Sequence, residues 1–141
     1  MVSSMNAKDA LDALDYLNMN LSLVNAGLFL LQLLWSLFFL RAPRVPRSFM
    51  FFTYAMYLLT GAAVLLHFYT LSSGHGIPSG RSGAHLRYVV CQLLTVVAAH
   101  LLGSGKLADP KLGVRLMWLM ALFGLGVSFE AFRVYLVGMV Q

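Results

Sequence analysis

Residues 21–40 read LSLVNAGLFLLQLLWSLFFL, a stretch that contains no charged side chain. A helix of this length rises about 30 Å, which matches the hydrocarbon core of a bilayer. Three further apolar runs of similar length follow, near residues 49–71, 86–103 and 114–140. The sequence therefore predicts an all-α integral membrane protein. We expect a single membrane domain over residues 1–141, built as a bundle of four spanning helices.

The composition supports this class and argues against several others. Hydrophobic residues make up 60% of the chain and charged residues only 11%, well below the charged share of soluble domains. The formal net charge of +5 lies mostly in short connectors between the apolar runs, so we expect no nucleic-acid binding. Cys91 is the only cysteine, and no hydrolase triad or phosphate-binding glycine loop is present. We expect no enzymatic activity.

The basic residues predict how the chain lies across the membrane. Six of them fall in or beside the first and third connectors, and fewer fall on the opposite side: Arg41, Arg44, Arg47, Lys106, Lys111 and Arg115 against Lys8, Arg81 and Arg87. Connectors rich in arginine and lysine stay in the cytoplasm. Both termini are therefore expected on the non-cytoplasmic side of a bacterial-type inner membrane or its equivalent.

The segments outside the spans also carry signals. Aspartates and leucines alternate in a three-residue rhythm over residues 6–18, which predicts an amphipathic helix lying on the outer surface of the membrane. Pro43 and Pro46 predict a tight turn between the first two spans. Residues 72–85 are rich in glycine and predict an irregular external loop. Asp109 and Pro110 fit the cap and first turn of the last helix.

Four titratable side chains lie near one depth, close to the outer end of their spans, and form a predicted polar layer: His67, Arg87, Glu130 and Arg133. In a structural interpretation, Glu130 pairs with Arg133 or Arg87 and fixes the register of the helices. In a functional interpretation, the layer belongs to a proton or ion route and His67 changes its charge near neutral pH. Both interpretations stay open at this point.

The histidines also suggest a haem or metal site, because imidazole is a common ligand. His100 lies about 20 Å from His85 along the third run, so these two cannot share one iron. His67 and His85 could do so, but packing or interfacial roles are commoner for histidines in helices. We expect neither haem nor a bound metal.

Several segments occur in the order found in the proteorhodopsin and xanthorhodopsin group of microbial rhodopsins, and the chain resembles the first four of that family's seven helices. Residues 11–16 (LDALDY) resemble its acidic lead, and residues 38–46 (FFLRAPRVP) its first basic turn. The later segments with this resemblance are TG at 60–61, HFY at 67–69, LRY at 86–88, LLTV at 93–96 and MALFG at 120–124. The resemblance covers nearly the whole chain.

The resemblance implies retinal-pocket-like positions at Arg87, Cys91, Gln92, Thr95, Met120 and Gly124. It also brings departures from the family pattern. The family's carboxylate counterion falls at Cys91 or Val90, and its retinal-bearing lysine belongs to a seventh helix. Retinal is therefore expected only if a partner chain completes the bundle.

These observations predict a rhodopsin-related membrane protein without the retinal lysine and the counterion. We expect a non-pumping binding or assembly module that forms homo- or hetero-oligomers with other membrane helices in the lipid bilayer. One alternative is half of a split retinal protein, giving light-responsive ion transport or sensing with a second polypeptide. Another is an accessory subunit of a respiratory or photosynthetic membrane complex.

Overall fold

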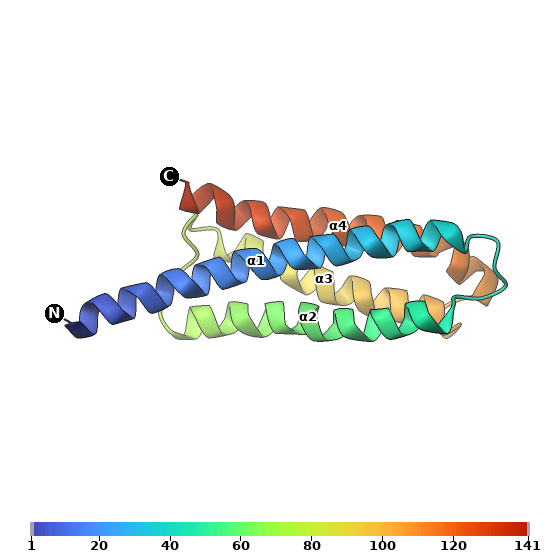
Figure 1. The fold of residues 1–141 in the computed structure, drawn as a ribbon, viewed down its shortest axis with the longest axis horizontal. Helices are drawn as coiled ribbons and strands as arrows, with labels where there is room; N and C mark the ends of the chain where they lie inside the picture. The colour runs from blue at the N-terminus through green and yellow to red at the C-terminus, as the bar shows by residue number, and fades with distance from the viewer. Residues whose placement is uncertain (1, 141) are drawn as a thin grey trace.

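The computed structural model describes the backbone from residue 2 to residue 140 and the side chains from residue 6 to residue 140. It contains four helices, α1 (Val2–Phe38), α2 (Arg47–Ser72), α3 (Ser82–Gly103) and α4 (Pro110–Met139), which lie side by side along the length of the molecule (Figure 1). All four are long and apolar enough to cross a membrane. The predicted all-α class and the four-helix bundle are confirmed.

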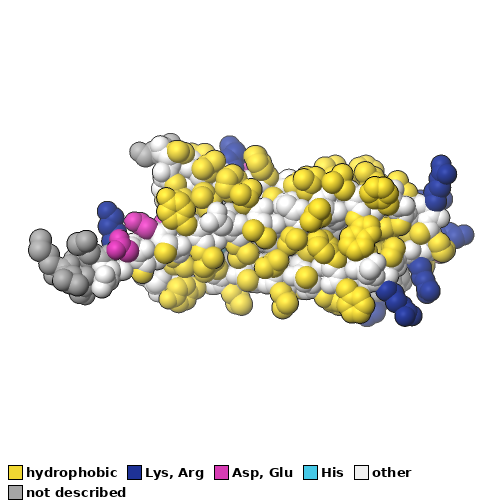
Figure 2. Space-filling model, viewed as in Figure 1, with side chains coloured by type: hydrophobic (Ala, Val, Ile, Leu, Met, Phe, Trp, Pro, Cys, Tyr) yellow, Lys and Arg dark blue, Asp and Glu magenta, His cyan; other side chains and the backbone are white. Residues whose placement is uncertain are grey.

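The bundle has two ends of different chemistry. The terminal end holds both chain termini and the α2–α3 connector, residues 73–81 (Figure 1). The basic end holds the α1–α2 connector, residues 39–46, and the α3–α4 connector, residues 104–109, together with the adjoining turns of α2 and α4. Figure 2 shows lysines and arginines gathered at the basic end, acidic side chains near the N-terminus, and hydrophobic side chains over the surface between them.

Helix α1 is continuous, so the prediction of a separate surface helix at residues 6–18 is wrong. No proline or glycine precedes Gly27, and nothing in this stretch ends a helix. Asp15, Asn18 and Ser22 are buried, so the side of α1 that faces the other helices extends to the terminal end. The helix therefore gains contacts with the bundle by continuing straight, whereas the sequence rhythm suggested a turn onto the membrane surface.

The other helix boundaries lie close to the predicted ones. Pro46 directly precedes α2, as expected for a turn containing two prolines. The Asp109 carboxylate accepts a hydrogen bond of 2.9 Å from the Lys111 amide, and Pro110 is the first residue of α4. Helix α3 begins earlier than predicted, at Ser82, so the loop expected at 72–85 is only the nine-residue connector 73–81.

The helices form a closed ring of contacts. Helix α1 packs against α2 and α4, and α3 packs against the same two helices. Glycines on α4 permit two of these approaches. A Cβ at Gly113 would overlap the carbonyl oxygen of Leu102 on α3, and one at Gly124 would overlap the Phe29 ring on α1. The interior is therefore enclosed by four helices of one chain.

The basic end of the interior is filled by an apolar plug, made of Phe39, Val45, Phe49, Ala99, Leu102, Val114 and Met117. The Phe49 ring meets the Phe39 ring at 4.9 Å and the Trp35 ring at 5.5 Å, both edge to face. Aromatic rings favour this geometry. The plug closes the basic end of the bundle with well-packed apolar side chains.

Candidate functional site

Between the plug and the terminal end, much of the interior is polar. On α1 the buried polar residues recur every three or four positions, and Phe29 is the apolar member of the stripe that they form. Residues from α2, α3 and α4 face this stripe. We call the buried polar side chains together the polar core: Asp15, Asn18, Ser22, Asn25, Gln32, Ser36, Thr53, Thr60, His67, Thr70, His85, Gln92, Thr95 and Ser128.

Hydrogen bonds between helices run through the polar core. The Asn25 side-chain amide on α1 donates to the Gln92 side-chain oxygen on α3 over 2.9 Å. The Gln32 side-chain amide donates to the Thr53 hydroxyl on α2 over 3.3 Å. Such bonds give helices in an apolar surrounding a specific register, because lipid supplies no competing partners. The signal was present in the sequence as Asn, Ser and Gln at helical spacing within a leucine-rich run.

The most unusual contact of the polar core joins two histidines. The Nδ1 atoms of His67 on α2 and His85 on α3 are 2.7 Å apart, and their rings stack with centroids 5.0 Å apart. The Tyr135 ring of α4 meets the His85 ring edge-on at 4.7 Å. All three side chains are fully or almost fully buried. We call His67 and His85 the imidazole pair.

A hydrogen bond between two ring nitrogens fixes the chemistry of the imidazole pair. One Nδ1 carries the proton and the other supplies the lone pair, so two neutral rings must be opposite tautomers. Both Nε2 atoms and the Tyr135 hydroxyl lack a hydrogen-bond partner among the described side chains. Because the two Nδ1 atoms bond to each other, an iron between these rings would first have to separate them.

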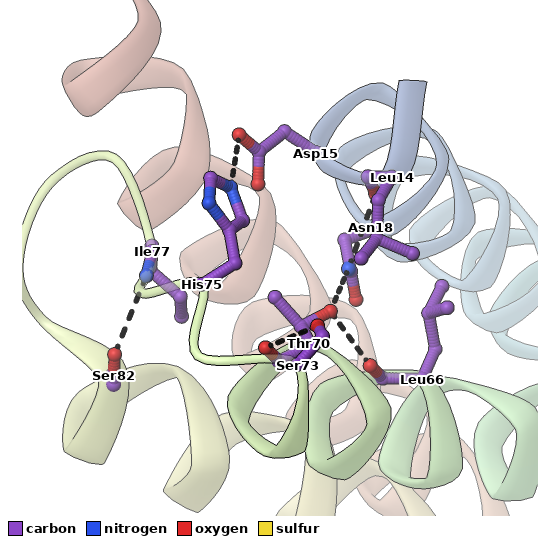
Figure 3. A network of polar contacts seen from close by, with 9 residues as sticks. All are labelled: Leu14, Asp15, Asn18, Leu66, Thr70, Ser73, His75, Ile77 and Ser82. Carbon is purple, nitrogen blue, oxygen red and sulfur yellow. Dashed lines mark hydrogen bonds and ion pairs between the residues drawn. The ribbon is translucent and has the colours of Figure 1, made fainter. Parts of the chain in front are cut away.

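A second polar network closes the terminal end (Figure 3). The ring of His75 in the α2–α3 connector lies 2.9 Å from the Asp15 carboxylate on α1. The Asn18 amide donates to the Thr70 hydroxyl on α2 over 3.0 Å. Ile77 is buried against Val134 and Tyr135 of α4. The predicted external loop is thus held across the end of the polar core by a histidine–carboxylate hydrogen bond and an apolar anchor.

The predicted polar layer does not form inside the bundle. Of its four members only His67 lies in the polar core, whereas Arg87 is exposed on the outside. Arg133 bonds Glu130 on the outer face of α4, with 2.6 Å between the closest atoms and about half of the arginine side chain exposed. Rise along a helix predicted similar depths, but the angle around each axis separates these residues. The structural pairing of Glu130 with Arg133 is present.

The six retinal-pocket-like positions are also divided. Cys91, Thr95 and Met120 line a groove of about 420 Å³ between α3 and α4, which we call the α3–α4 groove. Its other lining residues are apolar: Leu94, Ala98 and Phe123. Gln92 lies in the polar core, Gly124 lies against Phe29, and Arg87 is exposed. The Thr95 hydroxyl bonds the Cys91 carbonyl at 2.6 Å, which leaves the groove surface largely apolar.

Comparison of the chain with protein-family models, curated proteins and solved structures finds no match. Among the residues that the structure describes, no group of three or more His, Cys, Asp or Glu side chains is placed to hold a metal ion. The described side chains offer hydrogen bonding in the polar core and apolar contact in the α3–α4 groove.

Proposed function

We propose that the chain is a multi-pass membrane protein that acts as a non-pumping binding or assembly module. Its distribution of polarity supports this. Large apolar side chains such as Phe51, Leu58 and Leu65 are more than 70% exposed, while amides and imidazoles are buried. An apolar surface of this extent is unfavourable in water and suits the acyl chains of a bilayer. Alkaline carbonate extraction of native membranes tests this placement, and we expect the chain to stay in the membrane pellet.

In the proposed orientation the basic end faces the cytoplasm and both termini face outward. The excess of lysine and arginine at the basic end supports it. The test places single cysteines at Ser73 and at Ser104 in a Cys91→Ala background, because these two exposed serines lie at opposite ends of the bundle. We expect a membrane-impermeant maleimide to label Ser73→Cys in intact cells and Ser104→Cys only after permeabilisation.

The observation that carries the non-pumping proposal is the apolar plug, which closes the polar core at the basic end. An ion crossing the bundle would have to pass the plug, where Phe49, Val114 and Met117 are fully buried. The cost of placing a charge in such a layer is several kcal/mol. The ring of helix contacts also favours a self-contained module over half of a split retinal protein, since α4 packs directly on α1.

The α3–α4 groove is the proposed contact surface of the module. An apolar groove beside exposed Phe123 and Leu94 suits a transmembrane helix of a second copy or of another subunit. The test is Ala98→Trp, which fills the groove, with Ala62→Trp on the exposed face of α2 as the matched control. Cross-linking in native membranes should lose its main product only in Ala98→Trp. Equal losses in both variants would remove the groove from the proposal.

Kinship to the microbial rhodopsins belongs to the same proposal and is supported by the order of the resembling segments alone. The three lysines, Lys8, Lys106 and Lys111, are all exposed, so the polypeptide offers no amine to tether retinal in its interior. We expect no red-shifted, hydroxylamine-sensitive band when retinal is added to the purified chain. Such a band would favour the light-responsive alternative. Consistent recovery of one large respiratory or photosynthetic complex would favour the accessory-subunit alternative.

A further inference from the structure

The basic end contains a hollow of about 460 Å³ that the proposed function does not use. Arg41 comes from the α1–α2 connector, and Lys111 and Arg115 come from the first turns of α4. Leu40, Ala42 and Pro43 complete the lining, so none of the residues that line the hollow is acidic. We call this site the basic hollow. It brings together three positive charges from segments about 70 positions apart in the sequence.

The backbone on both sides of the basic hollow is held in place. Phe39 and Val45, at the two ends of the connector, are buried in the plug beside Val114 of α4. A turn bond of 2.9 Å from the Ala42 amide to the Phe39 carbonyl fixes the chain between them. Lys111 and Arg115 are four residues apart and therefore lie on one face of α4. The three cationic side chains are exposed, and the backbone that carries them is fixed by packed elements.

The charge around the basic hollow is not balanced by the protein. Six of the ten lysines and arginines lie at the basic end: Arg41, Arg44, Arg47, Lys106, Lys111 and Arg115. The acid at this end is Asp109, whose carboxylate accepts the Lys111 amide as a helix cap. The N-terminus of α4 adds partial positive charge. An anion in the hollow would relieve this repulsion.

We propose that the basic hollow binds the phosphate group of an anionic phospholipid. The inference rests on the proposed membrane placement, which puts this end of the apolar helices at the depth of the lipid headgroups. The guanidinium groups of Arg41 and Arg115 present paired donors that match phosphate oxygens. Leu40 and Pro43 offer apolar contact for the first carbons of the lipid. Basic pockets beside membrane helices are suited to such headgroups.

The test measures lipid binding to the purified full-length chain in neutral detergent by native mass spectrometry. Phosphatidic acid, phosphatidylglycerol and phosphatidylcholine are the probes, and inorganic phosphate is the competitor. The test variant is the triple substitution Arg41→Gln, Lys111→Gln and Arg115→Gln. The matched control, Arg44→Gln, Arg47→Gln and Lys106→Gln, removes the same charge at the same end outside the hollow. We expect anionic-lipid binding to weaken at least about tenfold in the test variant and less than about twofold in the control.

Three outcomes overturn the proposal. Equal weakening of lipid binding in both triple variants would mean general electrostatic attraction to the surface. Phosphatidylcholine binding as tightly as phosphatidic acid would mean that the site does not recognise the charge of the headgroup. Displacement of the lipid by inorganic phosphate at comparable concentration would make the ligand soluble phosphate.

A second variant, Arg115→Lys, covers the case in which the triple variant fails to fold, because it keeps the charge and removes the paired donors. We expect lipid binding to be about threefold weaker in this variant, and unchanged binding counts against the site. Release of the chain from native membranes by alkaline carbonate would contradict the proposed membrane placement. Failure of the proposed function is therefore distinguishable from failure of the lipid-binding proposal.

Discussion

The two ends of the bundle bury opposite chemistries. At the basic end the interior is filled by the apolar plug, whose side chains make close apolar contacts without hydrogen bonds. Toward the terminal end the interior holds Asp15, Asn18 and the imidazole pair, which are joined by directed hydrogen bonds. In a bilayer the surrounding acyl chains are as apolar as a leucine, so burying apolar area adds little and close packing must hold the plug together. Polar contacts hold the other end, together with the packing of Ile77 against Val134 and Tyr135.

The plug and the polar core also differ in the polar side-chain atoms that they bury. The seven plug residues have apolar side chains, so no hydrogen-bonding group of theirs needs a partner. Near the terminal end Asp15 Oδ1, both Nε2 atoms of the imidazole pair and the Tyr135 hydroxyl have none among the described residues. Unpaired buried polar atoms are costly and often mark a functional region. The polar core therefore retains unused hydrogen-bonding capacity, whereas the plug has none.

The largest effect is expected in the plug. Phe49→Ala removes a fully buried ring that contacts the rings of Trp35 and Phe39, and the cavity it leaves lowers the free energy of unfolding by about 3 kcal/mol. Phe51→Ala, two positions away on the same helix, removes a ring that is 72% exposed. It should change the free energy of unfolding by less than about 0.5 kcal/mol. Unfolding of both variants in one detergent measures the difference. Equal losses would contradict a packed plug.

A smaller effect is expected in the middle of the polar core. Asn25→Leu leaves the Gln92 side-chain oxygen without its donor and should lower the free energy of unfolding by about 1–2 kcal/mol. Asn20→Leu changes an exposed residue of the same helix and serves as the control. The double variant Asn25→Leu with Gln92→Leu should lose less than the sum of the single losses. Strict additivity would show that the two side chains do not interact.

Sequence patterns predicted the positions of the helices well, because length and hydropathy are local properties. Each of the four apolar runs lies in a helix, and the turn at Pro43 and Pro46 and the cap at Asp109 agree with the structure. Neither property tells which side of a helix faces its neighbours, and for this reason Arg87 was placed in a polar layer that it does not join.

The candidate site was predicted only in part for the same physical reason. His67 and His85 were recognised as a possible pair, but their direct contact depends on how α2 and α3 are rotated. The inward stripe of α1 was visible as polar residues at helical spacing, but Asn25 and Gln32 were not predicted to bond across the bundle. Their partners, Gln92 and Thr53, are distant in sequence. Closure of α1 onto α4 is a tertiary property that no single segment encodes.

The imidazole pair gives a prediction about proton positions. Because one Nδ1 must donate to the other, nitrogen NMR of the labelled chain in micelles should show one ring protonated at Nδ1 and the other at Nε2. His67→Leu removes this bond and should lower the free energy of unfolding by about 1 kcal/mol. In that variant the His85 resonances should shift and those of the distant His100 should not. Identical tautomers at His67 and His85 would contradict the contact.

The smallest effect is expected on the outer face of α4, where Glu130 and Arg133 pair three residues apart with about half of the arginine side chain exposed. Ion pairs that remain exposed contribute little to stability, so Glu130→Gln should leave the folded yield and the unfolding midpoint unchanged within error. The measurement also sharpens the contrast between the interior and the surface of the bundle. A loss as large as that of Asn25→Leu would mean that another helix or the acyl chains cover this face in the native membrane. The pair would then be buried in the assembled protein, and its outer face, rather than the α3–α4 groove, would be the contact surface to map next.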